Sequence, residues 1–325
     1  MGGWRLRLVG WLTLVVAAVG VTLWSRGQEV PVLALDPQWE NGEVRLGLVA
    51  PAGVYRVESS DTLSGWDPLV TLKGTGSNRV TTVAPPDRTA RFYRAVAESD
   101  PNALTGDHFR TSDGDLVIHP VNHASIVLRW REMMIYNDPV GAASRYSGLP
   151  RADLILISHD HGDHFEAATL NTVRKEGTVM VAPAAVYSRL SAALKALTIP
   201  LANGAQTNFQ GVTVEAIPAY NANHPKGAGN GYVLTLGGRR MYMSGDTGNI
   251  PEMRSLPDID VAFVCMNVPF TMTIPDAVTA VRAFRPTVVY PYHFRNQNGA
   301  LADLAAFKRG VSSDPGIEVR RRVWY

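Results

Sequence analysis

The sequence predicts an α/β fold in which two β-sheets pack face to face between outer layers of helices, an αββα four-layer sandwich. Apolar runs such as SIVLRW, DLILIS and DVAFVCM are typical of strands that are buried on both faces of a sheet. Several such strands follow one another early, and helical periodicity becomes regular only beyond residue 164. Helices that follow the strands would then cover the outer faces of both sheets.

Four stretches of the chain show helical periodicity. They are FEAATLNTVRKEG at 165–177, AAVYSRLSAALKAL at 184–197, PDAVTAVRAF at 275–284 and ALADLAAFKRG at 300–310. The first is expected to end at Gly177, because glycine commonly terminates a helix.

The composition describes a globular chain without a strong electrostatic bias. Of 325 residues, 46% are apolar and 18% are charged, which excludes a disordered chain. The formal net charge of +2 gives no indication of a nucleic-acid partner. The one cysteine, Cys265, excludes both an intramolecular disulfide and a metal site built from several thiolates.

The N-terminal residues 1–28 predict export. Arg5 and Arg7 precede an uncharged apolar run at residues 8–24, and Arg26 follows it. This is the arrangement of a signal peptide or of a single transmembrane anchor with its amino end in the cytoplasm. We expect a membrane-anchored extracytoplasmic protein, or a periplasmic or secreted one if the segment is cleaved; both alternatives stay open.

Two domains are expected beyond this segment. Residues 29–98 alternate apolar with polar side chains between clusters of turn residues, which predicts a small β-sandwich. This part resembles a short β-module often appended to exported bacterial proteins. Residues 99–107 have the composition of a linker, and residues 108–325 form the larger α/β domain.

The segment HDHGDH directly follows the apolar strand DLILIS. His159 and His161 are one residue apart, so in extended backbone both imidazoles face the same side and can bind one ion. Asp163 and His164 follow where the chain turns toward a helix, which aims them at a second position. Imidazole and carboxylate together suit zinc and also manganese or iron.

This segment resembles the signature of the metallo-β-lactamase superfamily, whose members are dinuclear metallohydrolases of αββα fold. The resemblance implies three further ligands: His224 for the first metal, Asp246 bridging both metals, and His293 for the second metal. It thus implies seven ligands in all, which are His159, His161, Asp163, His164, His224, Asp246 and His293.

Other segments are similar to the L-ascorbate-6-phosphate lactonase-like branch of that superfamily. One is His123, which precedes the first strands, together with Asp138-Pro139 after the next strand. The others are the sequences IPAYN, GDTGN, MNVPFTMT and YPYHF. On this basis we expect His123, Asp138, Asn267 and Met272 near the substrate or behind the ligands. Asp160 matches no ligand position and is expected to support a histidine ligand, and Tyr220 and Asn221 are polar groups close to His224 that could hold an anion. Lys226 and Arg295 are additional polar groups that could hold an anion.

A dinuclear site of this kind predicts a hydrolase. Two divalent ions, for which zinc is the favoured metal and manganese or iron the alternatives, would convert a shared water to hydroxide. The hydroxide would attack an ester-type bond, in a lactone or a phosphodiester. Asp163 and Asp246 are the expected catalytic carboxylates. Two alternatives remain: a non-enzymatic surface protein with a structural metal site, and a phospholipase D-like phosphodiesterase acting on a lipid-like ester at the membrane.

Overall fold

The computed structural model describes residues 34–40, 43–74, 80–84, 92–314, 316–322 and 324. The predicted export segment, residues 1–28, therefore lies outside the described residues. The chain divides into two compact units, Met1–His108 and Phe109–Tyr325, which we call unit 1 and unit 2. Strand β7 (Gly106–Thr111) begins within the predicted linker and crosses this division.

Unit 1 is built from short antiparallel strands in two groups. One sheet has the order β1-β2-β5, and the second group has the order β4-β3-β6. Their bounds are Ala34–Glu40 (β1), Glu43–Val49 (β2), Gly53–Ser60 (β3), Asp67–Gly74 (β4), Val80–Ala84 (β5) and Phe92–Ala97 (β6). Leu46 of β2 and Val57 of β3 share one buried cluster with Tyr93, so side chains from the two groups meet in a common core.

The first sheet of unit 2 continues in the order β8-β9-β10-β11-β12-β13. The strands are Gly114–Asn122 (β8), Ser125–Trp130 (β9), Met133–Asn137 (β10), Ala152–Leu156 (β11), Arg174–Ala182 (β12) and Thr198–Pro200 (β13). Pairing is antiparallel from β8 to β10 and parallel from β10 to β13. The histidine segment, residues 159–164, follows the carboxyl end of the parallel strand β11.

The second sheet has the order β14-β15-β16-β17-β18-β19-β20. Its strands are Gln206–Phe209 (β14), Val212–Asn221 (β15), His224–Leu236 (β16), Arg239–Met243 (β17), Val261–Cys265 (β18), Val288–Tyr292 (β19) and Glu318–Val319 (β20). The hairpin between β16 and β17 turns at Gly237 and Gly238, with φ of 49° and 74°. Beyond β17 the pairing is parallel, so the ends of β17, β18 and β19 lie at one edge.

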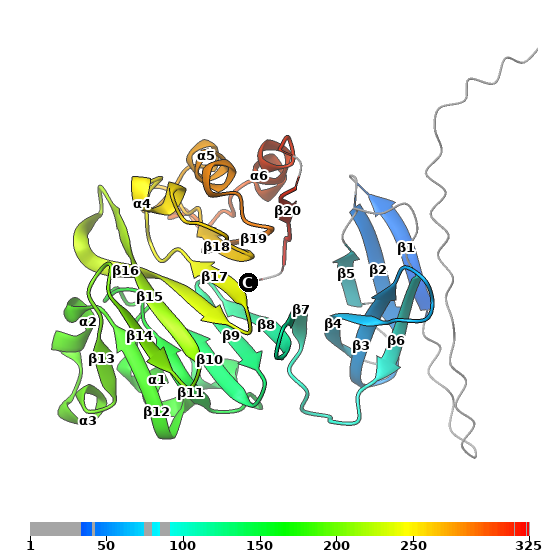
Figure 1. The fold of residues 1–325 in the computed structure, drawn as a ribbon, viewed down its shortest axis with the longest axis horizontal. Helices are drawn as coiled ribbons and strands as arrows, with labels where there is room; N and C mark the ends of the chain where they lie inside the picture. The colour runs from blue at the N-terminus through cyan, green and yellow to red at the C-terminus, as the bar shows by residue number, and fades with distance from the viewer. Residues whose placement is uncertain are drawn as a thin grey trace, which may run out of the picture. The chain divides into compact units, whose positions relative to one another are not determined.

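One hydrophobic core fills the space between the two sheets, as residues of β8–β11 and of β15–β19 belong to the same buried cluster. Figure 1 shows α4 (Pro251–Arg254), α5 (Ile274–Phe284) and α6 (Leu304–Val311) together beside β17, β18 and β19. α1 (Ala167–Val173) forms the crossover between the parallel strands β11 and β12. The αββα prediction is confirmed.

Three predicted helices are shorter than expected: the one predicted over 300–310 begins only at Leu304, after the capping Asp303, and the other two differ as follows. The first ends at Val173, not at Gly177, because residues from Arg174 onward pair with β11 as strand β12. The second is divided into α2 (Ala184–Arg189) and α3 (Ala192–Lys195), with the Ser191 hydroxyl capping α3 through the Leu194 amide. Helical periodicity alone did not account for strand pairing or for a capping serine inside the pattern.

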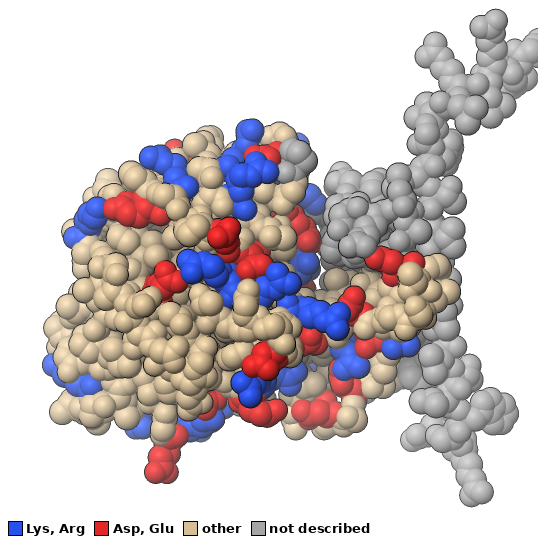
Figure 2. All heavy atoms as spheres, viewed as in Figure 1, with Lys and Arg blue, Asp and Glu red and all other residues tan. Residues whose placement is uncertain are grey.

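The surface of unit 2 carries both signs of charge. On the face shown in Figure 2, basic and acidic side chains are intermixed. Within the described part of the chain, no helix has the length and apolar character needed to cross a bilayer.

Candidate metal centre

The predicted ligands lie at the ends of the central strands of unit 2, most of them on the loops that follow these strands. His159–His164 follow β11, Asp246 follows β17 and His293 follows β19, while His224 opens β16. Because β11, β17 and β19 each belong to a parallel part of a sheet, their carboxyl ends present loops at one edge. Segments separated by more than 100 residues thus meet in one place.

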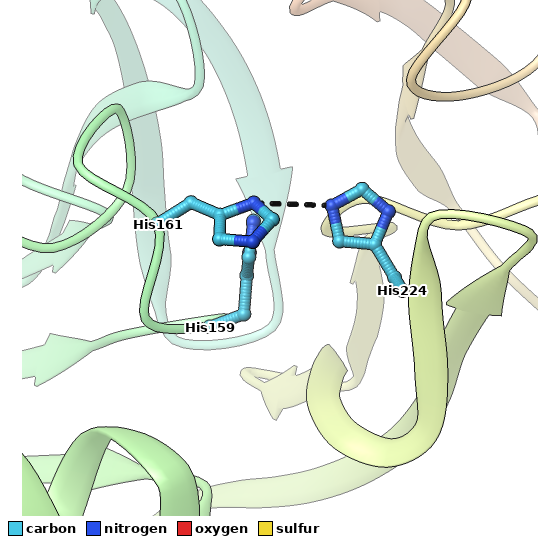
Figure 3. Close-up of side chains that lie close together, drawn as sticks. All are labelled: His159, His161 and His224. Atoms are coloured by element: carbon cyan, nitrogen blue, oxygen red, sulfur yellow. Dashed lines mark hydrogen bonds between the residues drawn. The ribbon is translucent and has the colours of Figure 1, made fainter.

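Three histidines form the first cluster. The side chains of His159, His161 and His224 point toward one another (Figure 3), and their ligand nitrogens lie within 4.8 Å of each other. His161 Nδ1 is 3.3 Å from His224 Nε2. The rings of His159 and His161 are 4.7 Å apart, as expected for alternate residues that face the same side.

A second cluster contains His164, His293 and Asp163. The two Nε2 atoms of His164 and His293 are 2.9 Å apart. Asp163 Oδ2 lies 3.4 Å from His293 Nε2 and 3.8 Å from His164 Nε2. The histidine side chains are almost fully buried, whereas the Asp163 side chain is 48% exposed, so this cluster is open on the Asp163 side.

Asp246 lies between the two clusters and is 4% exposed. Its Oδ2 is 3.6 Å from His224 Nε2 in the first cluster. Its Oδ1 is 3.2 Å from His164 Nε2 and 3.3 Å from His293 Nε2 in the second. One carboxylate therefore offers a separate oxygen to each cluster.

The donor set fits metal ions. Ligands around a tetrahedral ion with bonds of about 2.0–2.1 Å lie about 3.3 Å apart, close to the separations seen here. Two imidazole nitrogens at 2.9 Å repel unless a proton or a cation lies between them. In addition, His159 Nε2 and Asp246 Oδ1 are buried atoms without a hydrogen-bond partner among the described residues. Such buried atoms are costly unless an ion satisfies them.

The ligands are oriented by groups behind them. His164 Nδ1 donates to Asp138 Oδ2 at 2.8 Å, which leaves His164 Nε2 free to face the cluster. Asp138 is fully buried and also accepts from the Ser158 amide and hydroxyl, at 2.6 and 2.7 Å. His224 Nδ1 lies 3.0 Å from Asn221 Oδ1 in the same way. Sequence reasoning missed Ser158, although its position directly before the motif was a signal for it.

His123 contacts the second cluster directly. Its Nε2 lies 3.2 Å from Asp163 Oδ2, and its ring centroid is 3.7 Å from that of His293. Its backbone oxygen accepts from the His293 amide at 3.1 Å. His123 therefore fixes two members of the cluster, and it forms a third group of metal-binding type with Asp163 and His293.

The protonation states of the cluster also suit cations. Burial raises the pKa of the Asp246 carboxyl, but His293 and His164 outweigh it and hold that pKa well below its usual range. Burial and then the neighbouring His164 lower the pKa of His159 to about 2. Burial lowers the pKa of His164, but Asp246 and Asp138 raise it by a larger amount, so that this pKa lies well above its usual value. His164 therefore holds a proton where a metal ion would otherwise supply the positive charge. A metal ion would displace that proton.

The remaining predicted residues are divided between the site and the core. Asn267 is 4% exposed, and its Oδ1 accepts from the Thr271 hydroxyl at 2.7 Å. Met272 is 2% exposed and packs in the main core, which corrects its prediction as a pocket residue. Asp160 pairs with Arg189 at 3.0 Å and lines the small cavity beside the first cluster.

Tyr220 and Lys226 hold a carboxylate between them. Tyr220 donates its hydroxyl to Glu252 at 3.0 Å, and Lys226 Nζ lies 2.5 Å from the same carboxylate. The Lys226 ammonium also sits 4.8 Å from the centre of the Tyr220 ring. Lys226 is thus engaged within the chain, and the hypothesis that it holds an anionic substrate loses its basis.

A small cavity of about 60 Å³ adjoins the first cluster, lined by His159, His161, His224 and Asp246 together with small residues such as Ala219 and Gly229. A larger cavity of about 420 Å³ lies between the 3-10 helix η1 (Ala143–Tyr146) and α1 and includes no predicted ligand. The chemistry therefore belongs to the smaller space.

Comparison with known proteins identifies the family. Residues 134–294 match the β-lactamase superfamily domain family. The UPF0173 metal-dependent hydrolase of Thermus thermophilus is 30% identical over 209 residues, and the alignment covers 59% of this chain and 91% of that protein. The chain belongs to the metallo-β-lactamase superfamily, among the UPF0173 metal-dependent hydrolases.

Solved structures agree with this membership. A Parabacteroides distasonis protein provisionally described as a metal-dependent hydrolase is 37% identical to this hydrolase, with a TM-score of 0.60. That alignment covers 67% of this chain and 98% of the other. Igni18, a metallo hydrolase of Ignicoccus hospitalis, is 25% identical with a TM-score of 0.56, covering 64% and 94%. The hydrolase is therefore metal-dependent, and its unit 2 carries the family fold.

Proposed function

We propose that this metal-dependent hydrolase uses two divalent ions to cleave an ester-type bond, a lactone or a phosphodiester. The observation that carries the proposal is the position of Asp246, whose two oxygens face two separate groups of donors. A single structural site needs only four ligands and no bridging carboxylate. This favours a catalytic centre over a surface protein with a structural metal.

The donors divide into two sets that share Asp246. The first set is His159, His161 and His224, and the second is Asp163, His164 and His293. Zinc is the expected metal, with manganese or iron as alternatives. When bound, two such divalent ions would lower the pKa of a water and polarise the substrate oxygen that gains charge.

The chain's own residues prepare the site for this chemistry. Asp246 is ionised throughout the neutral range because neighbouring imidazoles lower its pKa. Asp163 is the most exposed carboxylate of the set, so its free oxygen can orient the attacking water. His123 Nε2 lies 3.2 Å from Asp163 Oδ2, the same oxygen that faces His293, and this contact helps to fix the orientation of the carboxylate.

We expect the purified chain to contain about two metal ions. Removing them with a chelator should abolish hydrolysis, and restoring zinc, manganese or iron should recover it. The measurement is metal analysis together with a hydrolysis screen of lactones, phosphodiesters, phospholipids and β-lactams. One tightly bound ion per chain with full activity would contradict the dinuclear proposal. Selective cleavage of phospholipids would favour the phospholipase D-like alternative.

We further propose that the hydrolase is exported through residues 1–28. The support is the uncharged apolar run at 8–24 between Arg7 and Arg26. Protease added to intact spheroplasts should digest unit 2, whereas a chain starting after residue 28 should stay protected. Equal protection of both chains would contradict export.

A further inference from the structure

Three large apolar side chains of unit 2 are exposed near the metal centre. Among the described residues of this unit, Val268, Phe270 and Leu301 are the large hydrophobic residues left open to solvent, with 38%, 36% and 51% of their surface exposed. A single exposed apolar residue needs no explanation. These three, however, lie on two neighbouring loops, one after β18 and one after β19.

The loop after β18 is tied to a metal ligand. Asn221 Nδ2 donates to the Phe270 carbonyl at 3.0 Å, while Asn221 Oδ1 lies 3.0 Å from His224 Nδ1. Asn223 Nδ2 donates to the Pro269 carbonyl at 2.9 Å. The backbone that carries Phe270 is therefore fixed to the same asparagine that orients His224.

The same loop is joined to the segment that follows His293. The Val268 amide donates to Asn296 Oδ1 at 3.0 Å, and the Gln297 amide donates to the Val268 carbonyl at 3.2 Å. Leu301 pairs with Arg295, two residues beyond His293. The apolar side chains thus stand on a rim that connects the loop beside His224 with the loop after His293.

Two cationic side chains beside the first cluster are already paired. Lys226 is bound to Glu252 at 2.5 Å, and Arg189 is bound to Asp160 at 3.0 Å. Apart from the ligands and the polar Asp160 and Asn223, the cavity wall next to the first cluster consists of small residues, among them the apolar Ala219, Pro225 and Ala228. An anionic substrate group would have to break an ion pair to reach Lys226 or Arg189, whereas an apolar group would displace water from apolar surface.

We propose that this rim binds the apolar part of the substrate, so that the hydrolase prefers esters carrying a hydrophobic chain of several carbons. The proposal rests on the proposed function, because it assumes that the reacting ester group lies at the metal centre. It assigns Val268, Phe270 and Leu301 to substrate binding. It also distinguishes this site from one that selects a phosphorylated or otherwise charged small molecule.

Binding of alkyl hydroxamates tests the proposal without turnover. The hydroxamate group chelates divalent metal, so its alkyl chain reports on the surface beside the centre. In detergent-free buffer, the zinc-loaded full chain should bind octanohydroxamate at least about tenfold more tightly than acetohydroxamate, because six added methylenes become partly buried. Calorimetric titration measures both dissociation constants.

Substitutions on the rim should remove this chain-length preference. Phe270→Ser and Leu301→Ser should each reduce the ratio of the two dissociation constants to about threefold or less. Leu63→Ser is the matched control, since Leu63 is 48% exposed in unit 1 and undergoes the same chemical change as Leu301. It should leave the ratio at its original value.

The other outcomes separate the two proposals. Equal affinity for the two hydroxamates would overturn the apolar rim and leave the metal centre intact. A ratio that persists in Leu301→Ser and Phe270→Ser would also overturn it. If the wild-type chain proves to be a dimer and these variants are monomers with an unchanged ratio, the rim binds a second copy and the proposal is overturned. Failure of both probes to bind the zinc-loaded chain would contradict the metal centre and, with it, the rim.

Discussion

Asp246→Asn should lower hydrolysis by about 10²–10³-fold, the usual effect of removing one preorganised electrostatic group from an active site. Asp246 is the carboxylate that faces both clusters, at 3.2–3.6 Å from His164, His293 and His224. An amide has no charge and only one oxygen, so it can serve one cluster at most. The variant should therefore also retain fewer than two metals per chain, which metal analysis of the purified protein measures.

The control for this variant is Asp258→Asn. Asp258 is exposed and lies twelve positions after Asp246 in the sequence. Its backbone is left-handed, with φ of 51°, which asparagine tolerates well. Its activity and metal content should match the wild type. If Asp246→Asn kept two metals and full activity, Asp246 would not be needed as a bridging carboxylate for hydrolysis. A circular dichroism spectrum like that of the wild type would show that the loss is local.

The ligand set could be predicted because much of it is encoded locally. Four of the seven donors lie within the six residues 159–164, and alternation along an extended chain already separates them into two directions. The other three were named from a resemblance, and the structure brings each of them to within 4 Å of another member of the set. The layers of the fold followed from buried strands, whose apolar runs need cover on both faces.

Contacts between distant segments could not be predicted in this way. Nothing in the sequence around Lys226 indicates that Glu252 lies 2.5 Å away. Likewise, the hydrogen bond from Asn221 to the Phe270 carbonyl joins residues 49 positions apart. Met272 was expected at the pocket because it lies in a segment similar to a lactonase-like branch, but its side chain packs in the core. Local patterns say which residues face inward, not which partners they meet.

The helix boundary at Val173 has a similar explanation. The stretch 165–177 keeps a helical pattern, yet strand β12 begins at Arg174 and pairs with Ala152 of β11. Pairing with a buried parallel strand supplies backbone hydrogen bonds that a frayed helix end would lack. Tertiary pairing therefore overrides local propensity at this point.

Asp138→Asn should weaken metal binding by about 10–100-fold, as expected when a group that orients a metal ligand is changed. Asp138 uses both carboxylate oxygens as acceptors: Oδ1 from the Ser158 amide, and Oδ2 from the Ser158 hydroxyl and His164 Nδ1. An asparagine replaces one of these oxygens with an NH₂ group, which faces a donor. Either the Ser158 amide or the His164 ring then loses its acceptor, and His164 is no longer held with Nε2 toward the cluster.

Competition with a chromophoric chelator would measure this loss, and thermal unfolding of the metal-free chain would measure the accompanying cost of about 1–3 kcal/mol for an unsatisfied buried donor. Asp153→Asn is the matched control, because Asp153 also accepts from a backbone amide, that of Met134 at 2.9 Å, and lies on β11 away from the ligands. It should lower stability and leave metal affinity unchanged. Unchanged metal affinity in Asp138→Asn would instead mean that packing around the fully buried His164 ring, and not Asp138, sets its orientation.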